Sequence, residues 1–386
     1  MKEVLISKPI SLSAFCLLLS AFCLFSCRKE PVIYPPDTDH PGEPENTNIQ
    51  GFYLLNEGNM GSNKSTLDYY DLDSGKYYRN IYADINPHVP KELGDVGNDL
   101  KIYGSKMYAV INSSNKIEVM DAKTAKRIGQ IDIPNCRYIK FHNGYAYITS
   151  FAGPVELNPD YQQLGYVAKV DTATLQILDK CLTGFQPEEL EIVNNKIYVA
   201  NSGSYMFPNY ENTLSVIDLT SFKETKRIKV ATNLHRVRGD KYGNIWVSSR
   251  GDYYTLPSRL YCIDSKIDMV TDSINIAISN FHLDDDRLYL CSAEWSNISM
   301  SYEVGYGIVD VASKQIITRN FITDGTENQI KRPYGIMVHP VTKDIYVTDA
   351  KSYVTPGTLY CFDHNGKKKW DVRTGDIPAH FALIYK

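Results

Sequence analysis

The chain has 386 residues, with 41 Lys and Arg against 45 Asp and Glu, for a formal net charge of −4. This near balance, without a lysine and arginine cluster that resembles a nucleic-acid footprint, argues against a nucleic-acid partner. Tyrosine is the one residue type in excess, with 29 copies, and it is typical of half-buried strands.

The first 27 residues have the composition of an export signal. An apolar run from Leu12 to Phe25 follows an early lysine, and the small residue Ser26 stands directly before Cys27. Leu24-Phe25-Ser26-Cys27 resembles the bacterial lipobox, so we expect residues 1–27 to be a lipoprotein signal peptide and Cys27 to be lipidated. The alternative is an ordinary secretory signal in which Cys27 is incidental. The run is too short to favour a retained membrane helix, and acyl chains would anchor the protein instead.

Residues 28–48 have the composition of a linker. Five prolines stand there among acidic and polar residues. Such a composition favours an extended, flexible tether that holds the following domain off the membrane. The alternative is a disordered tail of no consequence.

Seven short apolar segments, each ending in aspartate, follow at a nearly constant interval. Their closing aspartates lie 46 to 53 residues apart. A period of this length, carried by strand-like segments, is the signature of β-propeller blades. The predicted fold is therefore all-β, a seven-bladed β-propeller over residues 49–386 with four antiparallel strands in each blade. The segments are Leu67–Asp71, Ile117–Asp121, Val167–Asp171, Leu214–Asp218, Leu260–Asp264, Tyr306–Asp310 and Leu359–Asp363.

Each aspartate belongs to a four-strand unit. In the fourth unit, alternating residues predict an inner strand at Glu189–Ile192, and Asn194-Asn195 predicts a tight turn into the next strand. The first unit lacks an inner strand, whereas the chain ends in an orphan strand, Phe381–Tyr385. Pairing of that strand beside Phe52–Asn56 closes the ring and removes free sheet edges. No sustained 3.6-residue period follows residue 50, so helices should be nearly absent.

Long connectors after the second strands carry many aromatic residues. They span Phe151–Gln163, Ser202–Asn212, Arg250–Pro257, Ala293–Val304 and Lys351–Pro356, and all should lie on one face of the propeller. Exposed aromatic anchors on a rigid scaffold are typical of binding surfaces. The alternative is that each ring packs against a neighbouring blade. The candidate ligand-binding residues on these connectors are Tyr205, Phe207, Arg250, Tyr253, Trp295 and Tyr353.

The starts of the inner strands form a second candidate ring near the channel mouth. Aligned pairs of residues bring both signs of charge, amides and rings together there, which suits a large ligand with many amide and phosphate-like groups. The alternative is that these groups satisfy one another and a few channel waters. The candidate ligand-binding residues here are Asn98, Asp99, Arg137, Tyr138, Glu188, Glu189, His235, Arg236, Asn280, Tyr334 and His380.

Catalysis is a second class of function, because some propeller enzymes place a metal or cofactor at this mouth. Asp99, Glu188, Glu189 and nearby amides could in principle hold calcium. The sequence, however, has no nucleophile elbow, no Gly-rich phosphate loop and no supported His/Asp pair. The odd count of five cysteines after the signal favours buried free thiols over disulfides. We therefore expect a non-enzymatic protein with no catalytic cofactor and no metal.

The opening of the first blade resembles a known group of proteins. Residues 51–69, GFYLLNEGNMGSNKSTLDY, resemble the Bacteroidota lipoprotein propellers called YncE-like or surface-layer-like, and the resemblance extends over tether, blades and closing strand. Within that group the chain is similar to BtuG-type surface lipoproteins, which bind cobalamin outside the cell and sit on the TonB-dependent transporter BtuB. Arg28-Lys29-Glu30 supplies one acidic residue where surface-displayed lipoproteins of this phylum usually carry several.

The resemblance implies a lipid-anchored outer-membrane protein that faces the cell exterior. It implies that the protein binds cobalamin or related corrinoids and delivers them to a BtuB-like transporter, with cobalamin as a bound ligand. Two alternatives stay open at this point. One is a propeller receptor for another ligand, such as a glycan or peptide, in an uptake complex. The other is a lactonase-like or quinoprotein-like enzyme.

Overall fold

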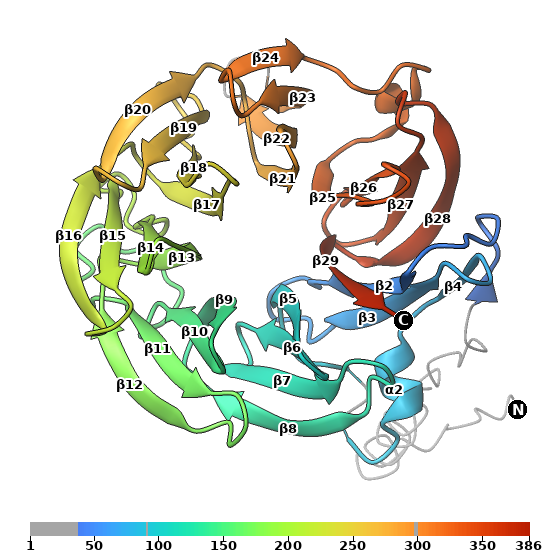
Figure 1. Cartoon of the computed structure of the whole chain (residues 1–386), viewed down its shortest axis with the longest axis horizontal. Coiled ribbons are helices and arrows are strands. Elements are labelled where there is room, and N and C mark those ends of the chain that lie inside the picture. Colours follow the sequence, from blue (N-terminus) through green and yellow to red (C-terminus); the bar gives the residue numbers. More distant parts are fainter. Residues whose placement is uncertain (1–37, 90–91, 297–299) are drawn as a thin grey trace, which may run out of the picture. The chain divides into compact units, whose positions relative to one another are not determined.

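The computed structural model describes residues 38–89, 92–296 and 300–386. The predicted signal peptide, Cys27 and residues 28–37 of the predicted tether lie outside this part of the chain. Within the described residues, strands form seven antiparallel sheets, six of four strands and one of five, set as blades around a central channel (Figure 1). The predicted seven-bladed propeller is confirmed.

Every blade repeats one strand order from the channel outward. The inner strands are β5 (Gly97–Tyr103), β9 (Cys136–His142), β13 (Pro187–Val193), β17 (Leu234–Gly239), β21 (Asn280–Asp284), β25 (Pro333–Val338) and β29 (Pro378–Tyr385). The second strands are β2 (Ile49–Asn56), β6 (Lys106–Ile111), β10 (Tyr145–Ser150), β14 (Lys196–Asn201), β18 (Asn244–Ser249), β22 (Arg287–Ser296) and β26 (Ile345–Asp349). The third strands are β3 (Thr66–Asp71), β7 (Lys116–Asp121), β11 (Tyr166–Asp171), β15 (Thr213–Asp218), β19 (Arg259–Asp264), β23 (Ser301–Asp310) and β27 (Pro356–Phe362). The outer strands are β4 (Lys76–Tyr78), β8 (Arg127–Asp132), β12 (Ile177–Leu182), β16 (Lys223–Lys229), β20 (Met269–Ile274), β24 (Gln315–Thr318) and β28 (Lys368–Asp376).

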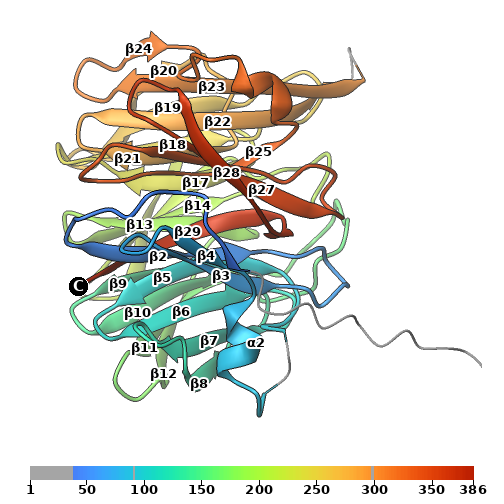
Figure 2. The same cartoon turned by 90° about the vertical axis from the view of Figure 1, so that its right-hand side faces the viewer.

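The ring closes through the end of the chain. β29 takes the inner position of the first blade and pairs antiparallel with β2, so that Phe381 lies opposite Leu54. The two strands lie side by side in both views (Figure 1 and Figure 2). The predicted closing strand is confirmed and begins earlier than expected, at Pro378. A short strand, β1 (Thr38–Asp39), pairs with β4 and adds a fifth strand to this sheet.

Apolar side chains between neighbouring blades form the core. One cluster, for example, joins Val110 and Val119 of the second blade to Ile139 and Ile148 of the third. Six second strands carry a large aromatic residue at one shared position, and full burial of such a side chain is worth about 2 kcal/mol. The core therefore fixes each blade against its neighbours and makes a rigid base for the connectors. These buried residues are Tyr108, Tyr147, Tyr198, Trp246, Tyr289 and Tyr346.

The aspartate that closes each repeat stabilises the turn into the outer strand. Asp121 Oδ1 accepts hydrogen bonds from the backbone N–H groups of Lys123 and Thr124, at 3.1 and 2.9 Å. Asp171 Oδ1 accepts the equivalent bond from Thr174 at 2.7 Å. Aspartate side chains commonly cap backbone N–H groups in this way at tight turns. The repeat that predicts the fold therefore marks blade geometry and not a ligand site.

The expected loop at Ala293–Val304 is instead a β-ribbon, so this prediction is wrong. β22 and β23 each have ten residues, and their pairing continues with Ala293 opposite Val304 and Trp295 opposite Tyr302. The physical reason is that backbone pairing between the two strands does not stop at the edge of the blade. The aromatic residues of this segment consequently stand on paired strands, which hold them more firmly than a loop.

Most other features agree with the sequence. Helix is confined, among the described residues, to α2 (Ile81–Ile85) and a short 3-10 helix at Thr326–Gln329. No helix in the described part of the chain has the length and apolarity needed to cross a membrane. The five cysteines in this part are buried and unpaired. The described residues 38–48 of the predicted tether differ from the expected flexible linker, because they pack against the first blade: β1 pairs with β4, and the Glu45 N–H donates to the Leu72 carbonyl at 2.7 Å.

Candidate functional site

A register shift near the start of the inner strands determines which side chains face the channel. β5, β9, β13, β17, β25 and β29 each change register against their second strand near this point. Such a bulge re-aims side chains, so that two consecutive residues can turn to one side. Arg137 and Tyr138, and likewise His235 and Arg236, accordingly line the channel mouth together.

Two adjoining hollows open on the face that carries the connectors, which we call the loop face. The larger, the recess, has a volume of about 650 Å³ and is lined by the fifth, sixth and seventh blades. The smaller, the inner mouth, has a volume of about 280 Å³ and lies over the starts of the inner strands. Four residues line both hollows: His235, Arg236, Arg250 and Tyr334.

Aromatic rings form one wall of the recess, and contacts among them fix their positions. Ring centroids are 5.3 Å apart for Trp295 and Tyr302, 6.3 Å for Tyr302 and Tyr353, and 6.1 Å for Tyr353 and Tyr334. The Arg332 guanidinium lies over the rings of Tyr302 and Tyr353, at 4.1 and 4.9 Å. Trp295 is 40% exposed, so part of its surface faces the solvent that a ligand would displace.

Glu188 is fully occupied by two arginines at the inner mouth. Its carboxylate contacts Arg137 Nη2 at 2.9 Å and Arg250 Nη1 at 3.2 Å, and its side chain is 1% exposed. Burial alone would raise the pKa of Glu188, but the two guanidinium charges outweigh burial and lower it. Glu188 therefore orders the two arginines and does not present a carboxylate to a ligand.

Two buried histidines near the channel axis are neutral: His235 lines the inner mouth, whereas His380 faces the cavity at the other end of the channel. The Nε2 atom of His235 lies 3.0 Å from Tyr138 Oη, and burial together with the Arg250 charge holds the pKa of His235 well below its usual value. His380 Nε2 lies 3.0 Å from Glu57 Oε1, a distance that would also suit an ion pair. Burial lowers the pKa of His380 in spite of Glu57, so this contact is a hydrogen bond from neutral imidazole.

Of four other predicted residues, Asn98 lines the inner mouth and Asn280 lines the recess, whereas Asp99 and Glu189 lie outside the lining of both hollows. Asp99 contacts Lys101 Nζ at 2.6 Å; burial would raise its pKa, but Lys101 and other partners lower it to about 2. Glu189 pairs with Arg238 at 3.4 Å. The Asn98 amide donates to the Arg137 carbonyl at 2.7 Å, and the Asn280 amide donates to the Tyr334 carbonyl at 3.0 Å. Asp99 and Glu189 are therefore paired with charged side chains of the protein, as the second interpretation of this ring expects, and do not face a ligand.

The connector residues divide between the two hollows and the rim. Tyr253 and Trp295 line the recess with Tyr353, whereas Tyr205 lines the inner mouth. Phe207 lies outside the lining of both hollows and packs against Tyr254, with ring centroids 5.5 Å apart.

Several lining residues escaped the sequence analysis. Glu57 and Met60 line the inner mouth, and both belong to the Asn-Glu-Gly-Asn-Met-Gly stretch that was treated only as a mark of resemblance. Glu303 lines the recess from the β-ribbon, beside Tyr302, which is one of the aromatic residues of the expected connector Ala293–Val304.

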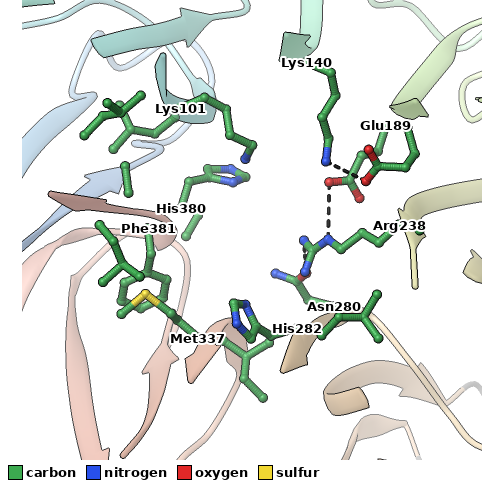
Figure 3. A pocket seen from close by; sticks show the side chains of 18 residues that line it. Lys101, Lys140, Glu189, Arg238, Asn280, His282, Met337, His380 and Phe381 are labelled. Carbon is green, nitrogen blue, oxygen red and sulfur yellow. Dashed lines mark hydrogen bonds and ion pairs between the residues drawn. The ribbon is translucent and has the colours of Figure 1, made fainter. Parts of the chain in front are cut away.

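A third cavity, of about 420 Å³, lies at the other end of the channel, toward the turns between inner and second strands. Figure 3 shows Lys101, Lys140, Arg238 and His282 directed toward one space. Each stands two residues beyond the second member of an aligned pair. The period-two alternation of a strand could therefore have predicted this tier from the sequence.

The charged groups of this third cavity pair with one another. Lys140 contacts Glu191 at 2.7 Å, and Arg238 shares Glu189 and Asn280. Burial and the charge of Arg238 lower the pKa of His282 to about 3, so this side chain is neutral. Within residues 38–89, 92–296 and 300–386, no group of three His, Cys, Asp or Glu side chains could hold a metal ion.

The sheets and channel define the class of this molecule as a seven-bladed β-propeller with a recess of about 650 Å³ on the loop face. The chain belongs to the family described as a domain of unknown function (DUF5074), which matches residues 50–381. No curated protein sequence matches the chain.

Solved structures share the fold at low sequence identity. A quinonprotein alcohol dehydrogenase-like protein from Bacteroides thetaiotaomicron is 16% identical, with a TM-score of 0.55, over 86% of this chain and 78% of that protein. Hydrazine synthase from Kuenenia stuttgartiensis is 15% identical, with a TM-score of 0.54, over 70% of this chain and 77% of that one. At such identities the likeness extends to the fold alone.

Proposed function

We propose that the protein is a receptor that binds cobalamin or a related corrinoid on its loop face. The observation that carries this proposal is the recess, which combines a volume of about 650 Å³ with a fixed aromatic wall. Ligand sites of this size commonly pair apolar walls with a few polar groups that set orientation.

The chemistry of a corrinoid suits these surroundings. A corrinoid is a broad disc with amides at its edge, and cobalamin adds a nucleotide loop. The rings of Trp295 and Tyr353 can cover apolar parts of the disc, while His235, Arg236 and Arg250 supply polar groups at the base. Because contacts between neighbouring rings already fix their positions, binding costs little further side-chain conformational entropy.

Binding without catalysis is part of the proposal. The carboxylates that could serve an enzyme at the channel mouth, Glu188 and Glu189, are paired with Arg137, Arg250 and Arg238. A carboxylate held in this way supports the shape and charge of a binding site better than it supports proton transfer.

The cellular setting is also a proposal. We propose that acylation of Cys27 anchors the protein in the outer membrane, facing the exterior, and that it passes its ligand to a BtuB-like TonB-dependent transporter. Growth with radiolabelled palmitate tests the anchor, since Cys27→Ala should abolish labelling and release the protein from the membrane. Retained label in that variant would contradict the anchor.

The ligand is tested directly with purified protein. We expect cyanocobalamin to co-elute with the protein from a sizing column, seen as visible absorbance in the protein peak. Trp295→Ala should retain less of that absorbance than the wild type, whereas Tyr242→Ala, which removes an exposed ring from a turn outside the recess, should retain as much. If cyanocobalamin does not co-elute with the wild-type protein, corrinoids are excluded as its ligand. Turnover of a lactone, or of an alcohol with added quinone cofactor, would establish an enzyme instead.

A further inference from the structure

Arg236 differs from the other arginines of the inner mouth. Arg137 and Arg250 share Glu188, at 2.9 and 3.2 Å. Arg236 is 4% exposed and lines both hollows, yet no hydrogen bond or ion pair joins its guanidinium to another described residue. The guanidinium instead lies over the ring of Tyr138 in a cation–π contact, with 5.1 Å between the guanidinium carbon and the ring centroid.

The carboxylates around Arg236 are already engaged. Glu57 accepts a hydrogen bond from Tyr334 Oη at 2.8 Å and lies 3.0 Å from His380 Nε2. Glu189 accepts the Val237 N–H at 3.0 Å and pairs with Arg238. Neither carboxylate lies within ion-pair distance of the Arg236 guanidinium, although both charges act on it at longer range. The buried guanidinium lines both hollows without a hydrogen-bonded carboxylate partner in the described chain.

The charges of the inner mouth leave an excess of one positive charge. Three arginines, Arg137, Arg236 and Arg250, line the inner mouth with one glutamate, Glu57. Glu188, outside this lining, pairs with Arg137 and Arg250, and His235 is neutral. The acidic residues of the recess, Glu294 and Glu303, stand on the β-ribbon instead. Burial of a charge without a partner is costly, and a guanidinium is suited to bind two oxygens of a phosphate or carboxylate at once.

We infer that Arg236 is the anchor for an anionic oxygen group of the ligand, a phosphodiester or a carboxylate, held where the recess meets the inner mouth. This inference rests on the proposed function, which places a ligand in the recess, and adds that the ligand carries a negative charge. In a corrinoid with a nucleotide loop, that group is the phosphodiester of the loop. A ligand with a free phosphate or carboxylate would share the same chemistry.

The first arm of the test compares two corrinoids. Dicyanocobinamide lacks the nucleotide loop and its phosphodiester, whereas cyanocobalamin carries both. Arg236→Met should weaken cyanocobalamin by about tenfold or more, as expected for loss of a charge-assisted hydrogen bond, and should leave dicyanocobinamide within about twofold. Arg319→Met, at an exposed arginine bonded to the Asn275 carbonyl, is the matched control and should change neither affinity. Equal weakening of both corrinoids by Arg236→Met would mean a structural role and overturn the inference.

The second arm uses inorganic phosphate and no corrinoid. At constant ionic strength, phosphate should raise the melting temperature of the wild-type protein and of Arg319→Met, but not that of Arg236→Met. Arg236→Lys keeps the positive charge but lacks the paired N–H donors of the guanidinium, so phosphate should raise its melting temperature by an intermediate amount. This variant provides a second test in case Arg236→Met does not fold. If the wild-type protein binds no corrinoid but phosphate stabilises it through Arg236, the proposed function fails and the anion site stands. An equal response of all variants to phosphate would overturn the anion site.

Discussion

The two ends of the channel are built from the same inner strands but differ in how their charges are used. At the turn end, Lys140 and Arg238 of the third cavity meet carboxylates of neighbouring blades, in Lys140–Glu191 and Arg238–Glu189, and Lys101 meets Asp99 of its own strand. At the loop end, Glu188 serves two arginines, and Arg236 has no carboxylate of its own.

The difference indicates which end is prepared for a ligand. A closed network of ion pairs orients its members but leaves them little to offer an incoming group. An aromatic wall beside an unpaired guanidinium offers both apolar surface and charge, and the recess supplies the space. Four predictions test this contrast, in order of decreasing expected effect.

Removing the Glu188 carboxylate, which Arg137 and Arg250 share, should give the largest loss of stability. Glu188→Ala leaves Arg137 and Arg250 without their buried partner, which should lower the free energy of unfolding by about 3 kcal/mol. Urea unfolding measures this change. Lys241→Ala, which breaks exposed pairs with Asp285 and Asp286, is the control and should leave the urea midpoint nearly unchanged. Equal effects of the two variants would show that the network at the mouth is not structural.

The aromatic wall should carry most of the binding free energy. Trp295→Ala or Tyr353→Ala should each weaken corrinoid binding by about 2 kcal/mol, or roughly thirtyfold, because each removes a ring that lines the recess. Isothermal titration measures this, with Tyr242→Ala as the control. Unchanged affinity in both wall variants would exclude these rings from the site.

Acid should destabilise the fold through its neutral histidines. Burial lowers the pKa of His235, His282 and His380 in the folded state, so the stability is complete above the unfolded value near 6.5 and is lost as the pH falls below it. For His282, with a folded pKa of about 3, the loss should be about 1 kcal/mol by pH 5.5. Melting temperatures from pH 7.5 to 5 should therefore fall less steeply for His282→Gln than for the wild type. Parallel curves would contradict the burial of a neutral imidazole at the turn end.

Phe207 should have the smallest effect on the ligand. Its ring is exposed on the rim and packs against Tyr254, outside the lining of both hollows. Phe207→Ala should change corrinoid affinity by less than about 0.5 kcal/mol. A loss as large as that of Trp295→Ala would extend the binding surface from the recess to the rim.

The sequence predicts the fold better than it predicts the site. The spacing of the aspartates determines blade number because each one caps the same turn, as Asp121 and Asp171 show. The orphan strand at Phe381–Tyr385 predicts ring closure because a propeller leaves one inner position unfilled.

Which charged groups remain unpaired cannot be predicted from spacing, because pairing depends on side chains from different blades. Glu188 and Arg236 both belong to aligned pairs, yet Glu188 contacts two arginines whereas no carboxylate of the described chain forms an ion pair with Arg236. The β-ribbon was missed for a related reason. Its pairing, Trp295 with Tyr302, depends on two strands continuing together beyond the blade.

The most direct test of the proposed site is to locate cobalt in crystals grown with cyanocobalamin. An anomalous difference map should show one cobalt peak in the recess, between the ring of Trp295 and the inner mouth at Arg236. A peak at the turn end beside Lys140 and His282, or no cobalt on a protein crystallised with excess ligand, would contradict the assignment of the recess.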